Sequence, residues 1–126
     1  MKKLLTLTAV AEAATGVALM VVPSLVGRLL FGAEFSGVAA VVGRFAGIAL
    51  FALGIACWLA RDDTQSRAAR GLVAAMLFYN FAVAALLSFT GLGLGLRGVM
   101  LWPAVVLHAA MAVWCVGCLR RSPQTP

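Results

Sequence analysis

The chain has 126 residues, of which 63% are hydrophobic and 11% are charged, and its formal net charge is +6. Its mean hydropathy of +1.05 is far above that of an ordinary soluble protein. This composition excludes a soluble globule, because a chain of this length could not bury so much apolar surface in its own core.

Four apolar stretches follow one another along the chain. Each is close to the ~20 residues that a helix needs to cross the hydrocarbon core of a bilayer. The stretches are too long for barrel strands and lack their alternating pattern, so a β-barrel is excluded. We therefore predict an all-α, integral membrane four-helix bundle that forms a single domain over residues 1–126, with spans at about residues 4–22, 38–60, 71–90 and 99–119.

The first predicted span allows a second interpretation. Lys2 and Lys3 precede an apolar run, and the AEA sequence around Glu12 resembles the cleavage site of a secretory signal. The apolar pattern continues past Glu12 to Val22, however, so we favour a retained span. Pro23 ends this span. The following connection, PSLVGRLLFGAEFSG, is apolar enough to lie in the membrane interface on the non-cytoplasmic side.

The other connections are short. The link RDDTQSRAAR is strongly polar, and we expect its Asp62 and Asp63 to be solvated. The link TGLGLGLRG contains the spacing GxGxxG, but dinucleotide binding needs a βαβ unit that the sequence does not predict. The tail RRSPQTP is polar, and we expect it to fray.

The distribution of Lys and Arg predicts the orientation, because these residues are retained on the cytoplasmic side. With four spans, seven basic residues fall on the side of the termini, and only Arg28 and Arg97 fall on the other. We predict both termini in the cytoplasm and a multi-pass protein of the inner (cytoplasmic) membrane. The charge of +6 then reflects topology and contact with anionic headgroups, and no nucleic-acid partner is implied.

Each predicted span carries one strongly polar residue well away from its ends: Glu12, Arg44, Asn80 and His108. Such residues are costly in a membrane and usually face the bundle interior. At 1.5 Å per residue, three of them lie ~12 to ~17 Å from the predicted cytoplasmic helix ends, and Arg44 lies at ~24 Å. The long side chain of Arg44 could reach toward this layer or toward the outer headgroups.

Helical phase predicts which of these residues face inward. Glu12 shares a face with Thr8, Thr15 and Gly16, a polar and small stripe suited to helix contact. On the second span Gly43 and Gly47 have GxxxG spacing beside Arg44. His108 lies on a side made mostly of small residues, whereas the alanines of the third span do not share the face of Asn80.

These residue types suggest a site for a ligand or a proton, formed by Glu12, Arg44, Asn80 and His108. A carboxyl group and an imidazole within reach of each other could relay a proton or bind a cationic amine, with Arg44 or His108 as the partner of Glu12. The alternative is an accessory or assembly subunit in which the buried polar groups only order helix contacts. No catalytic residue and no cofactor are predicted.

The three cysteines form a second candidate group. Cys57, Cys115 and Cys118 lie near the predicted cytoplasmic helix ends, and Cys115 and Cys118 have CxxC spacing. Three soft ligands could hold a metal, but no fourth residue completes a tetrahedral set. A membrane thiol redox or metal-handling role is therefore the third hypothesis, beside the simpler role of cysteine as a small packing residue.

Two families resemble the chain. EAATGVALMVVPSLVGRLLFG, GRFAGIALFALGIACW, FYN and LWPAVVLH together resemble small four-span bacterial membrane proteins, loosely of the DoxX-like group. That resemblance implies a helical bundle and no particular activity. AEAATGVALM around Glu12 is similar to the small multidrug resistance family, whose chains have four spans and a membrane-embedded Glu in the first; Arg44, His108 and the basic asymmetry depart from that pattern.

The predicted partners follow from these hypotheses. The chain is expected to contact the lipid bilayer and a small molecule or ion, and either a second copy of itself or a larger membrane complex. If it is an accessory subunit, the Gly43 and Gly47 face is the expected contact surface for that complex.

Overall fold

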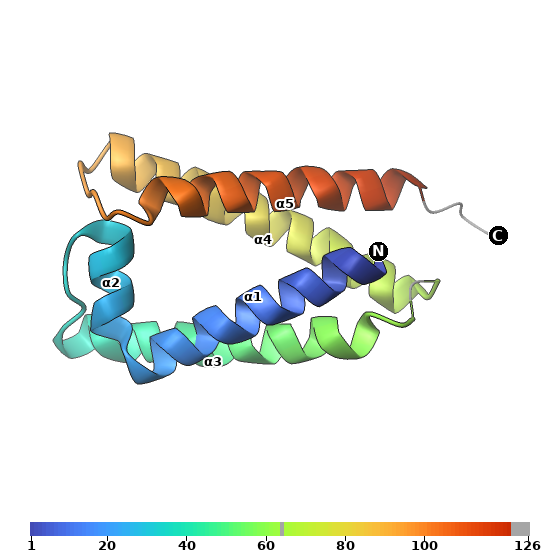
Figure 1. The fold of residues 1–126 in the computed structure, drawn as a ribbon, viewed down its shortest axis with the longest axis horizontal. Helices are drawn as coiled ribbons and strands as arrows, with labels where there is room; N and C mark the ends of the chain where they lie inside the picture. Colours follow the sequence, from blue (N-terminus) through green and yellow to red (C-terminus); the bar gives the residue numbers. More distant parts are fainter. Residues whose placement is uncertain (64, 122–126) are drawn as a thin grey trace.

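The computed structural model describes residues 1–63 and 65–121, which form five helices and no strand. Four long helices, α1 (Lys2–Val21), α3 (Gly37–Ala60), α4 (Arg67–Leu92) and α5 (Leu101–Arg121), run alternately up and down (Figure 1). The short helix α2 (Pro23–Phe31) lies across one end. The predicted all-α four-helix bundle is confirmed. The end of the predicted polar tail, residues 122–126, lies outside the described residues.

All four long helices are long and apolar enough to cross a membrane. Their outward faces carry large hydrophobic side chains, such as Phe78, Leu59 and Val113, that are about three-quarters exposed. Exposed apolar surface on this scale needs an apolar solvent, since soluble proteins rarely leave such large patches uncovered. The protein is therefore a multi-pass membrane protein with lipid against these faces.

Helices α1 and α3 form one tightly packed pair, because glycines let their backbones approach closely. A Cβ atom added to Gly16 would lie 2.7 Å from the carbonyl oxygen of Gly47, and one added to Gly47 would lie 2.7 Å from that of Gly16. Gly54 makes a similar approach to Ala9. Small residues at such positions are how helices associate where lipid removes the hydrophobic drive.

The Gly43 and Gly47 face is therefore used inside the protein. Gly47 packs on α1, and a Cβ at Gly43 would meet the side chains of Phe35 and Pro23 at 3.3 and 3.4 Å. Both glycines are buried. This face is not available as the partner surface that the accessory hypothesis required.

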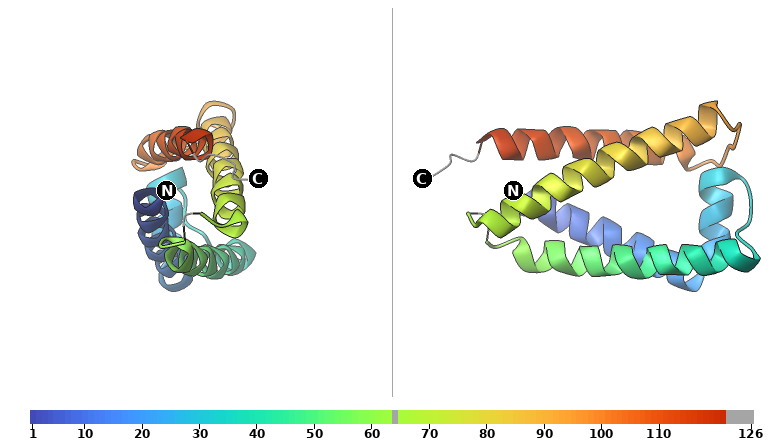
Figure 2. Two further views of the ribbon diagram at one scale, coloured as in Figure 1. Left: turned by 90° about the vertical axis from the view of Figure 1, so that its right-hand side faces the viewer. Right: turned by 180° about the vertical axis from the view of Figure 1, so that it is seen from behind.

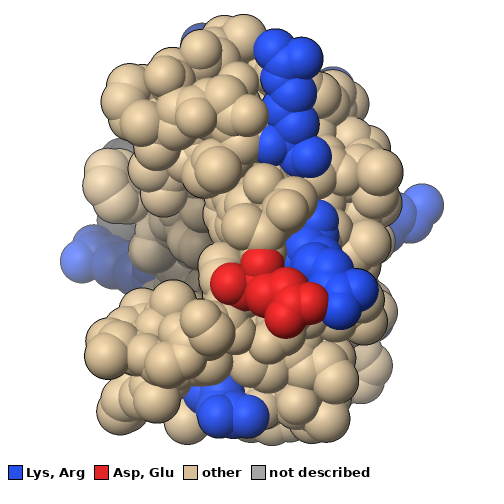
Figure 3. Space-filling model, turned by 90° about the vertical axis from the view of Figure 1, so that its left-hand side faces the viewer, with Lys and Arg blue, Asp and Glu red and all other residues tan. Residues whose placement is uncertain are grey.

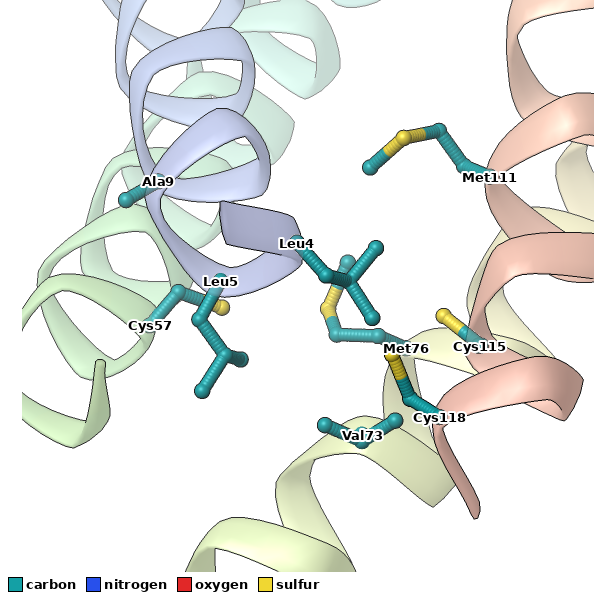
Figure 4. Close-up of a cluster of buried hydrophobic side chains, with 9 residues drawn as sticks. All are labelled: Leu4, Leu5, Ala9, Cys57, Val73, Met76, Met111, Cys115 and Cys118. Carbon is teal, nitrogen blue, oxygen red and sulfur yellow. The ribbon is translucent and has the colours of Figure 1, made fainter. Parts of the chain in front are cut away.

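Helices α4 and α5 form the second pair, and a buried cluster joins the two pairs near the start of α1 (Figure 4). The cluster combines aliphatic and sulfur-containing side chains from all four long helices. Its members are Leu4, Leu5, Ala9, Cys57, Val73, Met76, Met111, Cys115 and Cys118. Unbranched and polarisable methionines suit such irregular junctions.

Helix α2 joins the pairs at the other end. Pro23 begins it, which suits a first helical position, and Gly32 ends it in the left-handed conformation with φ of 72°. The N–H groups of Gly98 and Met100, in the α4–α5 link, donate to the carbonyl oxygens of Leu30 and Leu29 at 3.2 and 2.8 Å. The connection expected in the membrane interface thus contains a helix that lies across the ends of the long helices (Figure 2).

The start of α1, the end of α5 and the α3–α4 link lie at the same end of the bundle, which we call the terminal end (Figure 1). The opposite end, which carries α2, shows mostly uncharged surface with acidic atoms directly beside basic ones (Figure 3). Here Arg28 Nη2 lies 2.5 Å from Glu34 Oε1. The two ends therefore differ strongly in charge, as the sequence predicts.

Candidate functional site

Glu12 lies in the middle of α1 and faces the other helix pair. Glu12 is only 7% exposed, as expected from the stripe of polar and small residues on α1. The hydroxyl group of Tyr79, on α4, donates a hydrogen bond to Glu12 Oε2 at 3.3 Å. This hydrogen bond connects the α1–α3 pair to the α4–α5 pair, so the carboxyl group lies at the seam between them.

Tyr79 in turn contacts His108 of α5. The two ring centroids are 6.0 Å apart and the rings are inclined at 60°, an edge-on arrangement. Nδ1 of His108 lies 2.7 Å from the carbonyl oxygen of Ala104, which can only accept, so Nδ1 carries a proton and donates it. In the neutral ring, Nε2 is then the nitrogen that can accept a hydrogen bond.

Thr8 adds a further polar group one turn from Glu12 on the same face of α1. Thr8 is 1% exposed, and its hydroxyl oxygen has no hydrogen-bond partner among the described residues. Buried hydroxyl groups are normally paired, and an unpaired one is costly. Thr8 and Glu12 therefore present two buried polar groups side by side.

Asn80 and Arg44, which the sequence places in the same site, make their hydrogen bonds elsewhere. Asn80 is 2% exposed, and its Nδ2 donates to the carbonyl oxygen of Met76 at 2.8 Å within its own helix. Arg44 is exposed, and its Nε donates to the carbonyl oxygen of Met20 at 3.2 Å, near the α2 end. The side chain of Arg44 therefore extends toward the α2 end of the bundle and not toward Glu12.

No ion pair among residues 1–63 and 65–121 includes Glu12. The ion pairs Lys2–Asp62, Arg28–Glu34 and Arg61–Asp62 lie at the two ends of the bundle. A buried carboxylate without a counter-ion is unfavourable. Neither Arg44 nor His108 is the hydrogen-bond partner of Glu12; that role belongs to Tyr79.

The three cysteines are present as thiols and are buried in the cluster of Figure 4. Cys115 and Cys118 come from α5 and Cys57 from α3, and aliphatic side chains surround them. In the described part of the chain, no three His, Cys, Asp or Glu residues are grouped so that they could hold a metal ion. In the structure these three side chains pack between the long helices.

Sequence reasoning missed Tyr79. It directly precedes Asn80, and successive residues on a helix point about 100° apart. Asn80 lies on the buried face of α4, as an inward position requires, but the contact with Glu12 is made by its half-buried neighbour Tyr79. The available signal was the phenol itself, since a hydroxyl group deep in an apolar span needs a partner.

The carboxyl group of Glu12, the phenol of Tyr79 and the imidazole of His108 thus form a row across three helices. The hydroxyl group of Thr8 lies beside the carboxyl group. The resemblances to the DoxX-like group and to the small multidrug resistance family stay predictions. A scan of family models, a search of curated proteins and a search of solved structures each return no match to this chain.

Proposed function

We propose that the protein binds either a proton or a small amphipathic cation at Glu12, so that one replaces the other. The protein moves the bound proton or cation within the membrane. The observation that carries this proposal is a carboxyl group that is 7% exposed, is included in no ion pair of the described residues, and accepts a hydrogen bond from Tyr79. Ionisable residues inside membrane bundles mark ion and substrate pathways by default.

Tyr79 and His108 have distinct roles in this proposal. The phenol holds the Glu12 carboxyl group toward the seam between the helix pairs, and it can keep donating to either protonation state of the acid. In this proposal the imidazole of His108, whose ring contacts the phenol ring edge-on, is the next group that exchanges a proton. A cation that displaces the proton would pair with the carboxylate and lie against the two aromatic rings.

The seam suits such exchange because packing is close within each helix pair and sparse between them. The pairs are joined by the buried cluster at the terminal end and by α2 at the other end. Small relative movement of the pairs would change access to Glu12 without disrupting either pair. Shear of this kind is a known mode of switching between packed helices.

We also propose that the terminal end faces the cytoplasm and that the protein resides in the inner membrane. Seven Lys and Arg residues lie at or near this end, against Arg28 and Arg97 at the α2 end. This asymmetry follows the positive-inside rule. The resemblance of AEAATGVALM to the small multidrug resistance family supports a proton-linked role for Glu12 but does not define the ligand.

Labelling with a hydrophobic carbodiimide tests the binding site directly. The reagent adds a protonated carboxyl group across its C=N bond to form an O-acylisourea, so labelling reports a protonated acid within the membrane. We expect mass spectrometry to find the label on Glu12, with a rate that falls as pH rises. Tetraphenylphosphonium should slow the labelling if an amphipathic cation replaces the proton.

The controls use the other residues of the chain. Glu12→Gln should remove the label, whereas Glu34→Gln, which changes an exposed acid paired with Arg28, should leave it in place. If the labelling rate falls as pH rises but is unchanged by tetraphenylphosphonium, the ligand is a proton. Absence of label on Glu12, or labelling independent of both pH and cation, would overturn the proposal.

A further inference from the structure

The terminal end of the bundle carries a large excess of positive charge. Seven basic residues lie at or near it against two acidic ones, Asp62 and Asp63, which leaves an excess of five. The basic residues are Lys2, Lys3, Arg61, Arg67, Arg70, Arg120 and Arg121. A surface of one sign attracts ligands of the opposite sign.

Asp62 offsets only part of this charge. Lys2 Nζ lies 2.6 Å from Asp62 Oδ1, and Arg61 Nε lies 3.5 Å from its Oδ2. The hydrogen bond from the Lys2 ammonium group holds the pKa of Asp62 below its usual range, so this acid is ionised at neutral pH. Arg61 also lies over the ring of Trp58, with 3.8 Å to the ring centroid. One carboxylate is thus shared between two cations.

A hollow of 580 Å³ opens among these charges. It lies between the start of α1, the α3–α4 link and the end of α5. The residues that matter here are Lys2, Lys3, Gln65, Trp114, Gly117 and Arg121. A Cβ atom added to Gly117 would meet nothing within 4 Å, so this position leaves the hollow open.

A second hollow of 570 Å³ shares Lys2 and Lys3 with the first. Its other lining residues are Thr6, Leu7 and Val10, so it follows the outer face of α1 into the apolar part of the helix. Leu7 and Val10 are 45% and 56% exposed. The two lysines therefore stand between a cationic hollow and an apolar groove.

We propose that the two hollows form one binding site for an anionic phospholipid. The phosphate group occupies the first hollow and is bound by Lys2, Lys3 and Arg121, while an acyl chain lies along Leu7 and Val10 in the second. Charge-assisted hydrogen bonds from Lys and Arg are the usual means of holding phosphate. Trp114 lines the first hollow near the end of α5, a position in a spanning helix where an amphipathic indole is favoured.

The apolar groove is what selects a lipid over a soluble anion. Inorganic phosphate would use the cations alone, whereas a phospholipid also covers the exposed side chains of Leu7 and Val10. The position of the hollow at the ends of the spanning helices coincides with the headgroup layer of a bilayer. Basic pockets at this depth bind anionic headgroups in membrane proteins.

Quenching of Trp114 fluorescence by brominated lipids tests the site. The full chain with Trp58→Phe and Trp102→Phe leaves Trp114 as the single tryptophan. It is placed in phosphatidylcholine vesicles that contain either brominated phosphatidylglycerol or brominated phosphatidylcholine. We expect stronger quenching by the anionic lipid, and removal of one cation by Lys3→Gln should lower this preference about fivefold, the factor that corresponds to about 1 kcal/mol.

Further variants separate charge from shape. Gly117→Leu should fill the first hollow and reduce the preference while every charge is kept. Asp62→Asn removes a competing carboxylate from Lys2 and should preserve or increase it. Arg97→Gln, at the α2 end, is the matched control and should change nothing.

The proposal is overturned if the triple variant Lys2→Gln, Lys3→Gln, Arg121→Gln keeps the preference for phosphatidylglycerol. It is also overturned if inorganic phosphate at equal concentration competes as well as the lipid, because the site would then be a simple anion site. Circular dichroism of each variant in detergent confirms that helix content is unchanged. Because none of these residues touches Glu12, failure here leaves the proposed function intact.

Discussion

Replacing Glu12 with glutamine is expected to abolish proton or cation movement while the fold is kept. Glutamine has nearly the same shape, and its amide oxygen can still accept the hydrogen bond of Tyr79. It cannot gain or lose a proton or balance a cation. A positioned proton-transfer group contributes about 10²-fold or more to a rate, and we expect a loss of that order.

The flux is measured in proteoliposomes that enclose a pH-sensitive dye, after a pH gradient is imposed. Tyr79→Phe should give an intermediate rate, because it removes the hydroxyl group that holds the carboxyl but leaves the acid. Glu34→Gln should behave as the unchanged protein. If Glu12→Gln and the unchanged protein give equal flux, Glu12 has only a packing role and the accessory hypothesis gains support.

Replacing Gly47 with leucine is expected to force α1 and α3 apart. The new Cβ alone would lie 2.7 Å from Gly16 O, 2.9 Å from Leu19 Cβ and 2.9 Å from Met20 N. Two of these three atoms belong to the backbone of α1, so no side-chain rotation relieves the clash. Overpacking of this kind destabilises proteins by about 1–3 kcal/mol or more.

Thermal unfolding in detergent, followed by circular dichroism, measures this effect. Gly71→Leu is the matched control, because a Cβ at Gly71 of α4 would meet nothing within 4 Å. We expect a clear loss of stability for Gly47→Leu and little change for Gly71→Leu. Equal unfolding temperatures for the two variants would show that the close approach of α1 and α3 contributes no stability.

The inward position of Glu12 could be predicted because α1 has a clear pattern. Thr8, Glu12 and Gly16 recur at intervals of four residues, which places them on one face of a helix, and all three are buried. Helix α4 has no such pattern, since alanine, leucine and phenylalanine occur all around it. Its rotation, and with it the contact of Tyr79 with Glu12, could not be predicted from periodicity.

Arg44 shows a different limit. Its position along α3 follows from the sequence, but its long side chain can extend in either direction along the helix. The carbonyl oxygen of Met20 accepts its hydrogen bond because the close packing of α1 on α3 brings the end of α1 beside it. A contact of this kind depends on a neighbouring helix that the sequence of α3 does not contain.

The sequence by itself determined that the protein belongs in a membrane, that it has four long apolar helices, and that an acid lies on an inward face. Composition and the spacing of polar and apolar residues are local properties of the chain. They decide which face of a helix lies against lipid and which lies against protein. Only the tertiary structure decided that α1 pairs with α3 and α4 with α5, and that Tyr79 is the partner of Glu12. Lipid tails are as apolar as the helices, so hydrophobicity does not choose between neighbours; close backbone approach and individual hydrogen bonds make that choice.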